Sequence, residues 1–266
     1  LDVMINTTDD DFTRVELMMR QAALYEDHDT LHQRAFNTYA KAFVASPSTT
    51  EAREKVEVLS TELNNAAELA NVYMDAIEHC EDDTDKLHLY ERAATIWNDA
   101  LHDTAKAAQC YEAICAQDDQ NVDAIRALET IYAAEGKHEQ LVDVYKRHAE
   151  ISPSMIDQKD LFYKIADLQE GALNNSAAAI DTYLAVLDLD SEDQFALDAL
   201  EKLYQNTENW KELINIYQQK IDNASDADER IRLHVLAAQT QHDKLNDVDA
   251  AIEHYNSALA ESDEHV

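Results

Sequence analysis

Few residues of this chain stand at spacings that suit catalysis or metal binding. His138 and Glu139 begin like the His-Glu-x-x-His motif of zinc proteases, but Val142 occupies the place of the second histidine. His28 and His32 are four residues apart and could share one helix face, although two ligands alone make a weak metal site. We interpret this pair as surface histidines, and we expect neither a metal nor a cofactor.

The acidic run from Asp188 to Asp193 carries alternating carboxylates, as calcium loops do. A calcium loop also needs a turn glycine and a bidentate glutamate at set positions, which the run lacks. Cys110 and Cys115 are five residues apart, which is not the Cys-x-x-Cys spacing of metal and redox sites. We expect the acidic run to be a turn and the two cysteines to be small buried residues.

Glycine is scarce, with only Gly136 and Gly171 in 266 residues. Nucleophile elbows and phosphate-binding loops need several glycines at fixed positions, so the sequence excludes both. Acid pairs such as Asp82-Asp83 are common in an acidic chain and cap helices better than they catalyse. The sequence therefore predicts a protein that is not an enzyme.

Composition favours helices and an acidic surface. With 2 Gly and 2 Pro, the chain lacks the turn residues that a β protein of this size needs. The 55 Asp and Glu against 21 Lys and Arg give a formal net charge of −34. Such a surface repels nucleic acid and anionic membranes and attracts basic proteins. General solubility or a salty habitat explains the same charge, and the sequence leaves this choice open.

The cellular location is inferred from what the sequence lacks. No apolar run approaches the length of a transmembrane helix, and the acidic start is not a signal peptide. Three cysteines form an odd, sparse set that is typical of a reducing compartment or of core packing. We therefore expect a cytoplasmic protein. Because residue 1 is Leu rather than Met, we also expect the chain to be part of a longer protein.

Seven tyrosines recur along the chain, and the sequence numbers of successive members differ by 34 and 38 in alternation, which makes a 72-residue double unit. They are Tyr39, Tyr73, Tyr111, Tyr145, Tyr183, Tyr217 and Tyr255. Other series keep the step of the double unit, including Leu17, Leu89, Leu161 and Leu233, and Val56, Leu128 and Leu200. The residues around each tyrosine have helical periodicity. A period of this length indicates stacked supersecondary units.

Breaks between the periodic segments predict about fourteen helices in seven antiparallel pairs. Pro47 and Pro153 each lie eight residues after a tyrosine of the series, where a helix should stop. Ser48 and Glu51 are spaced as a capping box. The predicted helix starts are near residues 10, 28, 48, 65, 82, 103, 121, 137, 154, 175, 193, 208, 226 and 247. We expect residues 1–9 to be flexible and residues 10–266 to form a single repeat array.

These residues resemble the tetratricopeptide repeat family. The best unit matches the family at Leu128, Tyr132, Gly136, Tyr145 and Pro153. The unit from Gln194 to Ser225 keeps the aromatic pattern but lacks the turn glycine and the proline. Alternate units are four residues longer than the family's repeat. The resemblance covers nearly the whole chain and implies an all-α fold, a right-handed α-solenoid of about seven antiparallel helix pairs.

The resemblance also implies that the first helices of the pairs line a concave surface that binds a peptide or protein segment. The family's inner positions in the 34-residue units correspond to Glu51, Glu54, Val58, Thr61, Asp123, Arg126, Thr130, Ala133, Phe195, Asp198, Lys202 and Gln205. The register of the longer helices is ambiguous, so no residue is carried over there. Only Arg126 and Lys202 are basic, so we expect no clamp for a terminal carboxylate. A basic or amphipathic partner fits this surface better.

Three aromatic residues have two interpretations each. Phe195 could anchor a partner, because exposed aromatics concentrate binding energy, or it could pack against the preceding helix pair. We expect Trp97 and Trp210 to belong to the core rather than to a binding surface.

The sequence thus favours a protein–protein interaction scaffold. Two alternatives remain open, which are a structural spacer or self-assembly module of a larger repeat protein and a chaperone for a basic client. The oligomeric state and the partner's identity are also open.

Overall fold

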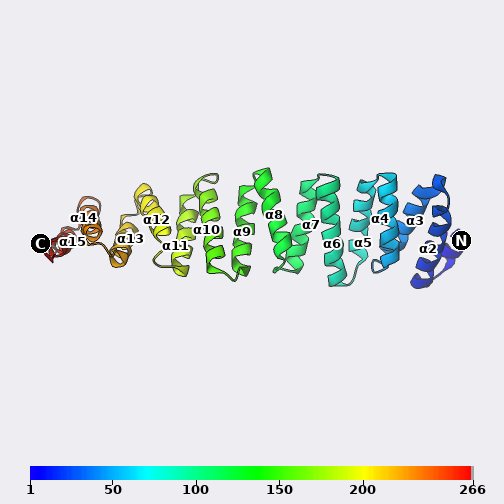
Figure 1. The fold of residues 1–266 in the computed structure, drawn as a ribbon, viewed down its shortest axis with the longest axis horizontal. Coiled ribbons are helices and arrows are strands. Elements are labelled where there is room, and N and C mark those ends of the chain that lie inside the picture. Colours follow the sequence, from blue (N-terminus) through cyan, green and yellow to red (C-terminus); the bar gives the residue numbers. More distant parts are fainter. Residues whose placement is uncertain (265–266) are drawn as a thin grey trace. The chain divides into compact units, whose positions relative to one another are not determined.

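The computed structural model describes residues 1–264, and within that range all regular secondary structure is helical (Figure 1). The prediction of an all-α repeat fold is confirmed. In chain order the elements are α1 (Asp2–Thr7), α2 (Asp11–Glu26), η1 (Asp29–Leu31), α3 (His32–Ala45), α4 (Thr50–Leu63), α5 (Ala66–His79), α6 (Asp83–Thr95), η2 (Ile96–Ala100), α7 (Thr104–Gln117), α8 (Val122–Glu135), α9 (His138–Ile151), α10 (Met155–Glu170), α11 (Ser176–Leu189), α12 (Gln194–Asn206), α13 (Trp210–Asn223), α14 (Ala227–Asp243) and α15 (Val248–Glu264).

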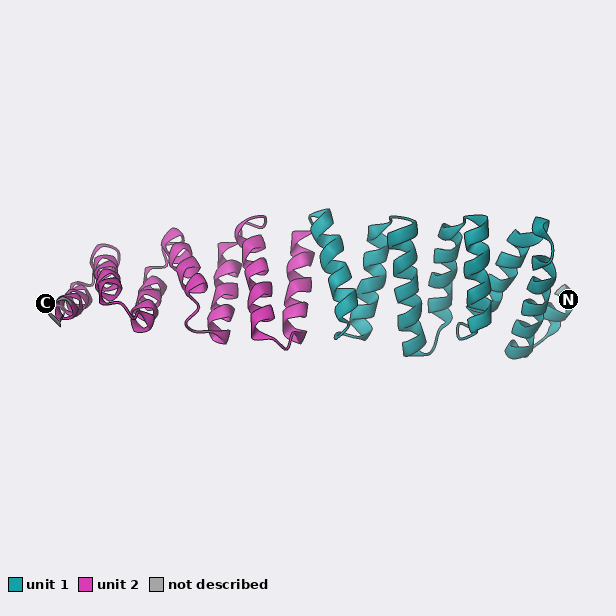
Figure 2. Ribbon diagram, viewed as in Figure 1, with its two compact units in different colours: residues 1–136 teal, residues 137–266 magenta. Residues whose placement is uncertain are grey.

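The helices divide into two compact units, Leu1–Gly136 and Lys137–Val266 (Figure 2). Inside each unit the contacts run mainly between helices that are consecutive in the chain. This local connectivity is typical of repeat proteins, in which a helix pair buries its apolar side only against its neighbours. Residues 1–9, predicted to be flexible, contain the short helix α1.

The helix starts follow the repeat seen in the sequence. The first helices α2, α6, α10 and α14 begin at Asp11, Asp83, Met155 and Ala227, so each start follows the previous one by a full double unit. The starts of the second helices α3, α5, α7, α9, α11, α13 and α15 are separated by the shorter and the longer step in alternation. All predicted starts but one lie within two residues of those observed. The exception is the start expected near 28, because η1 precedes α3 there.

Side-chain caps explain most of these starts. Asp82, Asp103 and Asn121 accept hydrogen bonds from backbone amides three residues later, at 2.9, 3.1 and 3.0 Å. These caps satisfy amide groups that the first turn of a helix leaves free. The predicted capping box at Ser48 is wrong, since the N-cap of α4 is Thr49, whose hydroxyl donates to Ser46 Oγ at 2.9 Å.

The turns inside the helix pairs use left-handed backbone at equivalent positions. Asn64, Gly136 and Glu208 have φ of 52°, 66° and 58° and recur once in each double unit. His102, Asn174 and Asn246 form a second such series, with φ of 54°, 46° and 55°. Glycine adopts this conformation without steric cost, and asparagine tolerates it better than most residues. Glu208 is therefore a strained member of the first series.

Replacing Glu208 with glycine is expected to raise the free energy of unfolding by about 0.5–1 kcal/mol, because the left-handed conformation penalises a side chain. The matched reverse change, Gly136→Ala, should lower it by about 1–2 kcal/mol for the same reason. Urea unfolding followed by circular dichroism measures both. A less stable Glu208→Gly variant would show that the turn is not strained.

The tyrosine series lies mostly in the core. Tyr39, Tyr73, Tyr183 and Tyr217 are buried, and their hydroxyl groups keep polar partners. Tyr39 donates to Glu26 and Tyr183 donates to Glu170, both at 2.8 Å and at equivalent positions of two double units. Burial of an aromatic ring is favourable when its hydroxyl is hydrogen-bonded, which explains why tyrosine rather than phenylalanine recurs.

The predicted core also included two tryptophans and two cysteines. Trp97 is 5% exposed, as predicted for a core residue. Trp210 is partly buried against the core of the second unit, and Lys244 Nζ lies 4.7 Å from the centre of its ring. Cys110 and Cys115 are buried, and burial raises the pKa of the Cys110 thiol to about 11.

Two histidines are in contact at the interface between α14 and α15. His234 Nδ1 lies 3.2 Å from His254 Nδ1, and this hydrogen bond needs one neutral acceptor. Burial, together with the charge of His254, lowers the pKa of His234, and burial lowers that of His254. Both groups bind protons more tightly in the unfolded chain, so folding should lose stability as the pH falls below the ordinary value of 6.5.

We therefore expect the wild-type protein to lose more thermal stability between pH 7 and pH 5 than the His254→Asn variant does. Differential scanning calorimetry at both pH values measures the difference. His28→Asn is the matched control, because His28 is exposed and should leave the wild-type pH dependence intact. Equal pH dependence of wild type and His254→Asn would contradict the expectation.

Candidate functional site

The predicted binding residues all lie on exposed surface. We call them the first-helix stripes, one on each of α4, α8 and α12. The α4 stripe is Glu51, Glu54, Val58 and Thr61; the α8 stripe is Asp123, Arg126, Thr130 and Ala133; the α12 stripe is Phe195, Asp198, Lys202 and Gln205. Steps of three and four residues keep each stripe on one side of its helix. The α4 and α8 stripes belong to the first compact unit and the α12 stripe to the second.

The sequence of each helix explains why the stripes are exposed. In α12 the buried residues are Ala196, Leu197, Leu200, Leu203 and Tyr204, which form the apolar side of the helix. The stripe residues lie on the opposite, solvent-exposed side of the helix. The same division holds in α4 and α8, since the three helices are related by the step of the double unit.

Phe195 is both exposed, as a partner anchor would be, and packed against the preceding helix pair. The residue is 62% exposed, although its ring meets Tyr163 of α10 edge-on at 5.0 Å between ring centres and Tyr183 of α11 at 6.4 Å. Tyr163 is in turn hydrogen-bonded to Asp193, and burial and this bond raise the pKa of its hydroxyl. Phe195 is therefore an exposed aromatic ring held on a rigid aromatic support.

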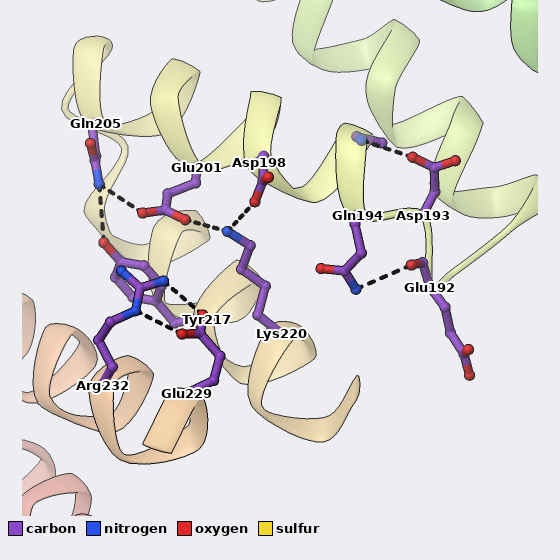
Figure 3. Close-up of polar contacts among 11 residues, drawn as sticks. Glu192, Asp193, Gln194, Asp198, Glu201, Gln205, Tyr217, Lys220, Glu229 and Arg232 are labelled. Atoms are coloured by element: carbon purple, nitrogen blue, oxygen red, sulfur yellow. Dashed lines mark hydrogen bonds and ion pairs between the residues drawn. The ribbon is translucent and has the colours of Figure 1, made fainter. Parts of the chain in front are cut away.

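Two polar residues of the α12 stripe, Asp198 and Gln205, are bound to the neighbouring helix α13 (Figure 3). Lys220, which is 8% exposed, contacts Asp198 at 2.6 Å and also pairs with Glu201. Burial alone would lower the pKa of Lys220, but the hydrogen bonds to these two carboxylates outweigh it and raise the pKa. Gln205 donates to the hydroxyl of Tyr217 at 3.0 Å. Asp198 and Gln205 thus already have partners in the free protein.

The two basic stripe residues are not engaged in this way. Within residues 1–264, neither Arg126 nor Lys202 has an ion-pair partner for its side chain, and both are exposed. The stripes also carry the apolar side chain of Val58, which is 53% exposed. An acidic group of a ligand could therefore bind Arg126 or Lys202, and an apolar group could contact Val58, without displacing an ion pair of the protein.

A cavity of about 700 Å³ extends the candidate site to α2, where sequence reasoning named no residue. Phe12, Val15, Met19 and Arg20 of α2 line it together with Glu51 of the α4 stripe. Phe12 is 74% exposed. These residues were missed because the register of the longer helices could not be assigned from the family pattern.

Sequence reasoning also missed a half-buried glutamate series behind the stripes. Glu57, Glu129 and Glu201 recur once in each double unit. Glu57 accepts hydrogen bonds from Tyr73 and, at 2.8 Å, from Arg92. Burial would raise the pKa of Glu57, but these two bonds outweigh it and lower the pKa. The regular recurrence of glutamate was a signal that could have found this series.

In the described part of the chain, no three or more His, Cys, Asp or Glu side chains gather in a way that could hold a metal ion. Over the same residues, no helix combines the length and the apolar character needed to cross a bilayer.

Comparison with known proteins gives a family match for part of the chain. Residues 124–157 and 196–231 match the sequence model of the tetratricopeptide repeat. Both segments begin in a first helix that carries a stripe, α8 and α12 respectively. No curated protein sequence matches the chain.

Solved structures with similar folds are distant. The crystal structure of MamA is 17% identical and covers 70% of this chain and 98% of its own, with a TM-score of 0.34. YrrB, described as a tetratricopeptide repeat protein with an unusual peptide-binding site, is 15% identical over 74% of this chain and 95% of its own, with a TM-score of 0.35. A tetratricopeptide repeat protein from Parabacteroides merdae is 12% identical over 92% of each chain, with a TM-score of 0.35. Because these TM-scores lie below 0.5, the similarities do not support a family or a function for this chain.

Proposed function

We propose that this chain, a tetratricopeptide repeat protein, is an interaction scaffold whose first-helix stripes bind a basic or amphipathic segment of another protein. The observation that carries the proposal is that every predicted stripe residue is exposed on α4, α8 and α12. Helices of this kind are rigid, and an exposed row of side chains on them can contact an extended or helical segment along its length.

The chemistry of the stripes indicates the class of partner. Four of the residues are acidic, namely Glu51, Glu54, Asp123 and Asp198, and two are basic. Phe195 supplies an aromatic ring whose packing on Tyr163 and Tyr183 limits the side-chain entropy lost on binding. A segment with lysines or arginines spaced around an apolar residue would complement this pattern.

The test begins with a partner segment selected in vitro. Twelve-residue peptides are selected from a random library on the immobilised protein, and the affinity of the best peptide is measured by fluorescence anisotropy. We expect selected peptides to be rich in lysine, arginine and apolar residues. Replacing Phe195 with alanine should weaken binding by more than about 1 kcal/mol. Replacing acidic stripe residues with neutral amides, as in Glu54→Gln with Asp123→Asn, should also weaken it, because their carboxylates attract a basic peptide.

The matched control changes exposed residues of a second helix. Gln218 and Gln219 lie on α13 outside the stripes, and Gln218→Ala with Gln219→Ala should leave the affinity unchanged. If the stripe variants bind the peptide as tightly as the wild type does, the stripes are not the binding surface.

A second candidate, a self-assembly module, is supported by α15. Val248, Ile252, Tyr255 and Leu259 form an apolar row on this helix and are 54, 51, 40 and 63% exposed. The counterparts of the last three in the preceding double unit, Ile180, Tyr183 and Leu187, are buried in the second unit, whose core includes residues of α12. Another helix could cover the row in the same way.

Sedimentation velocity at rising concentration tests this candidate. Self-association that is lost in the Leu259→Glu variant would support it, because the charge would be placed in the apolar row. A protein that stays monomeric at every concentration would argue against it.

A further inference from the structure

A second groove lies away from the stripes, in the second compact unit. It is a cavity of about 550 Å³ formed by α9, α10 and α11, which are labelled in Figure 1. Residues of the second helices α9 and α11 line its two sides, and Phe162, Ile165 and Gln169 of α10 line it between them. We call it the second-helix groove. No stripe residue lines it.

The repeat itself explains why this groove is open. The counterpart of Gln169 in the preceding double unit is Trp97, a much larger side chain that is 5% exposed in the first unit. One backbone hydrogen bond is similar at the two positions, although Trp97 lies in the π-helical turn η2 and Gln169 in the last turn of α10. The carbonyl of Trp97 accepts a hydrogen bond from the amide of Asp103 at 2.8 Å, and the carbonyl of Gln169 accepts one from the amide of Asn175 at 2.7 Å.

Two further replacements enlarge the groove. In the first unit Lys106 Nζ lies 3.8 Å from the centre of the Trp97 ring, whereas the equivalent residue in the groove is Ala178. Ile77 of α5 is likewise replaced by Ala149 of α9. The groove therefore lacks the indole of Trp97, the long chain of Lys106 and the branched chain of Ile77. The second unit keeps the helices that surround an aromatic ring and a cation in the first unit, but it lacks both groups.

The floor of the groove offers a hydrogen-bond donor. Gln169 is 4% exposed, and its Oε1 accepts a hydrogen bond from the hydroxyl of Thr182 at 2.7 Å. Among the described residues, none accepts a hydrogen bond from the amide nitrogen of Gln169. This nitrogen is not among the fully buried unpartnered polar atoms, so it reaches solvent and could donate to a ligand carbonyl in place of water.

The rim of the groove favours a cation. Glu150, Asp181 and Asp188 line it and are exposed, while Lys146 is the one basic residue among its described lining residues. A positive group on a ligand would therefore meet three carboxylates and one ammonium group. Surface attractions of this kind are individually weak, and they act mainly on partner choice.

We propose that the second-helix groove binds a segment of a partner protein that presents an aromatic side chain next to a lysine or arginine. The aromatic ring takes the space that Trp97 fills in the first unit. A backbone carbonyl of the segment accepts from the amide of Gln169, and the cation lies near Asp181 and Asp188. This site is independent of the first-helix stripes, so either can fail without the other.

The probe is the peptide acetyl-Lys-Trp-Lys-amide, titrated into the folded protein and followed by amide chemical shifts in NMR. We expect saturable shifts at Asp181, Thr182 and Ala185, which line the groove. Gln169→Trp, which copies the first unit, should fill the groove and weaken the peptide at least tenfold, equal to roughly 1.4 kcal/mol. Ala149→Ile copies the first unit at a second position and should also weaken it.

Controls separate this site from general attraction to an acidic protein. Acetyl-Lys-Ala-Lys-amide has the same charge without the ring and should bind at least tenfold more weakly. The stripe variant Phe195→Ala should leave the affinity for acetyl-Lys-Trp-Lys-amide unchanged. Should Gln169→Trp fail to fold, Ala149→Ile decides the question.

The proposal is overturned by any of three results. These are equal affinity for the two peptides, shifts confined to residues outside the groove, and unchanged affinity in the folded groove-filling variants.

Discussion

Replacing Leu200 with alanine is expected to lower the free energy of unfolding of the second compact unit by about 2–5 kcal/mol. Leu200 is completely buried in α12, in a cluster that includes Tyr183 of α11 and Tyr217 of α13. The substitution removes apolar contact and leaves a cavity that helices fixed by their neighbours cannot easily close. Urea unfolding followed by circular dichroism measures the loss.

The matched control lies two residues further along the same helix. Lys202 is exposed, so Lys202→Ala should change stability by no more than about 0.5 kcal/mol. Because repeats are stabilised by their nearest neighbours, hydrogen exchange in Leu200→Ala should rise most in α11, α12 and α13. Equal unfolding midpoints for the two variants would mean that Leu200 is not a core residue.

The second large effect is expected at Lys220, whose replacement by alanine should cost about 2–4 kcal/mol. The change leaves Glu201, whose side chain is 19% exposed, without its cation. Removing one partner of a fully buried ion pair costs about 3–5 kcal/mol. The expected loss is smaller here because the other partner, Asp198, is 59% exposed and can be hydrated.

A double-mutant cycle separates the ion pair from lost packing. Lys220→Met keeps most of the apolar chain, and adding Glu201→Gln should recover part of the stability because no carboxylate is then left unpaired. Lys211→Ala is the control, since Lys211 is an exposed lysine of the same helix. Additive effects of Lys220→Met and Glu201→Gln would show that the pair contributes nothing.

The sign of the pH dependence at Lys220 follows from its raised pKa. The folded protein holds this proton more tightly than the unfolded chain does, so the contribution is complete below the ordinary lysine value of 10.5. It is lost as the pH rises through the higher value of the folded state. Lys220→Met should therefore lose less stability than the wild type above pH 10.5.

The candidate site could be predicted in part. The resemblance to the tetratricopeptide repeat family placed the stripes on α4, α8 and α12. Helical periodicity explains why these positions are exposed, because it separates the apolar from the polar side of a helix. It could not show that Asp198 is bound by Lys220, or that Phe195 rests on Tyr163. These contacts join residues on different helices, and their geometry depends on how the helices pack.

The second-helix groove illustrates the same limit. Gln169, Ala149 and Ala178 are ordinary residues one by one, and each is compatible with a helix. The groove exists because all three stand around one space on three helices, where their counterparts Trp97, Ile77 and Lys106 are larger. Only a three-dimensional comparison of the two repeats shows that the missing groups are neighbours.

Residue order by itself determined where the helices begin, which side of each is apolar, and the length of the repeating double unit. These properties are local, because caps, turns and periodicity act within a few residues and the same burial problem recurs in every pair. Tertiary structure decided which surfaces are filled, which charges are already paired, and where a space is left open. Such properties depend on side-chain volumes and charges brought together from separate helices, which no single segment encodes.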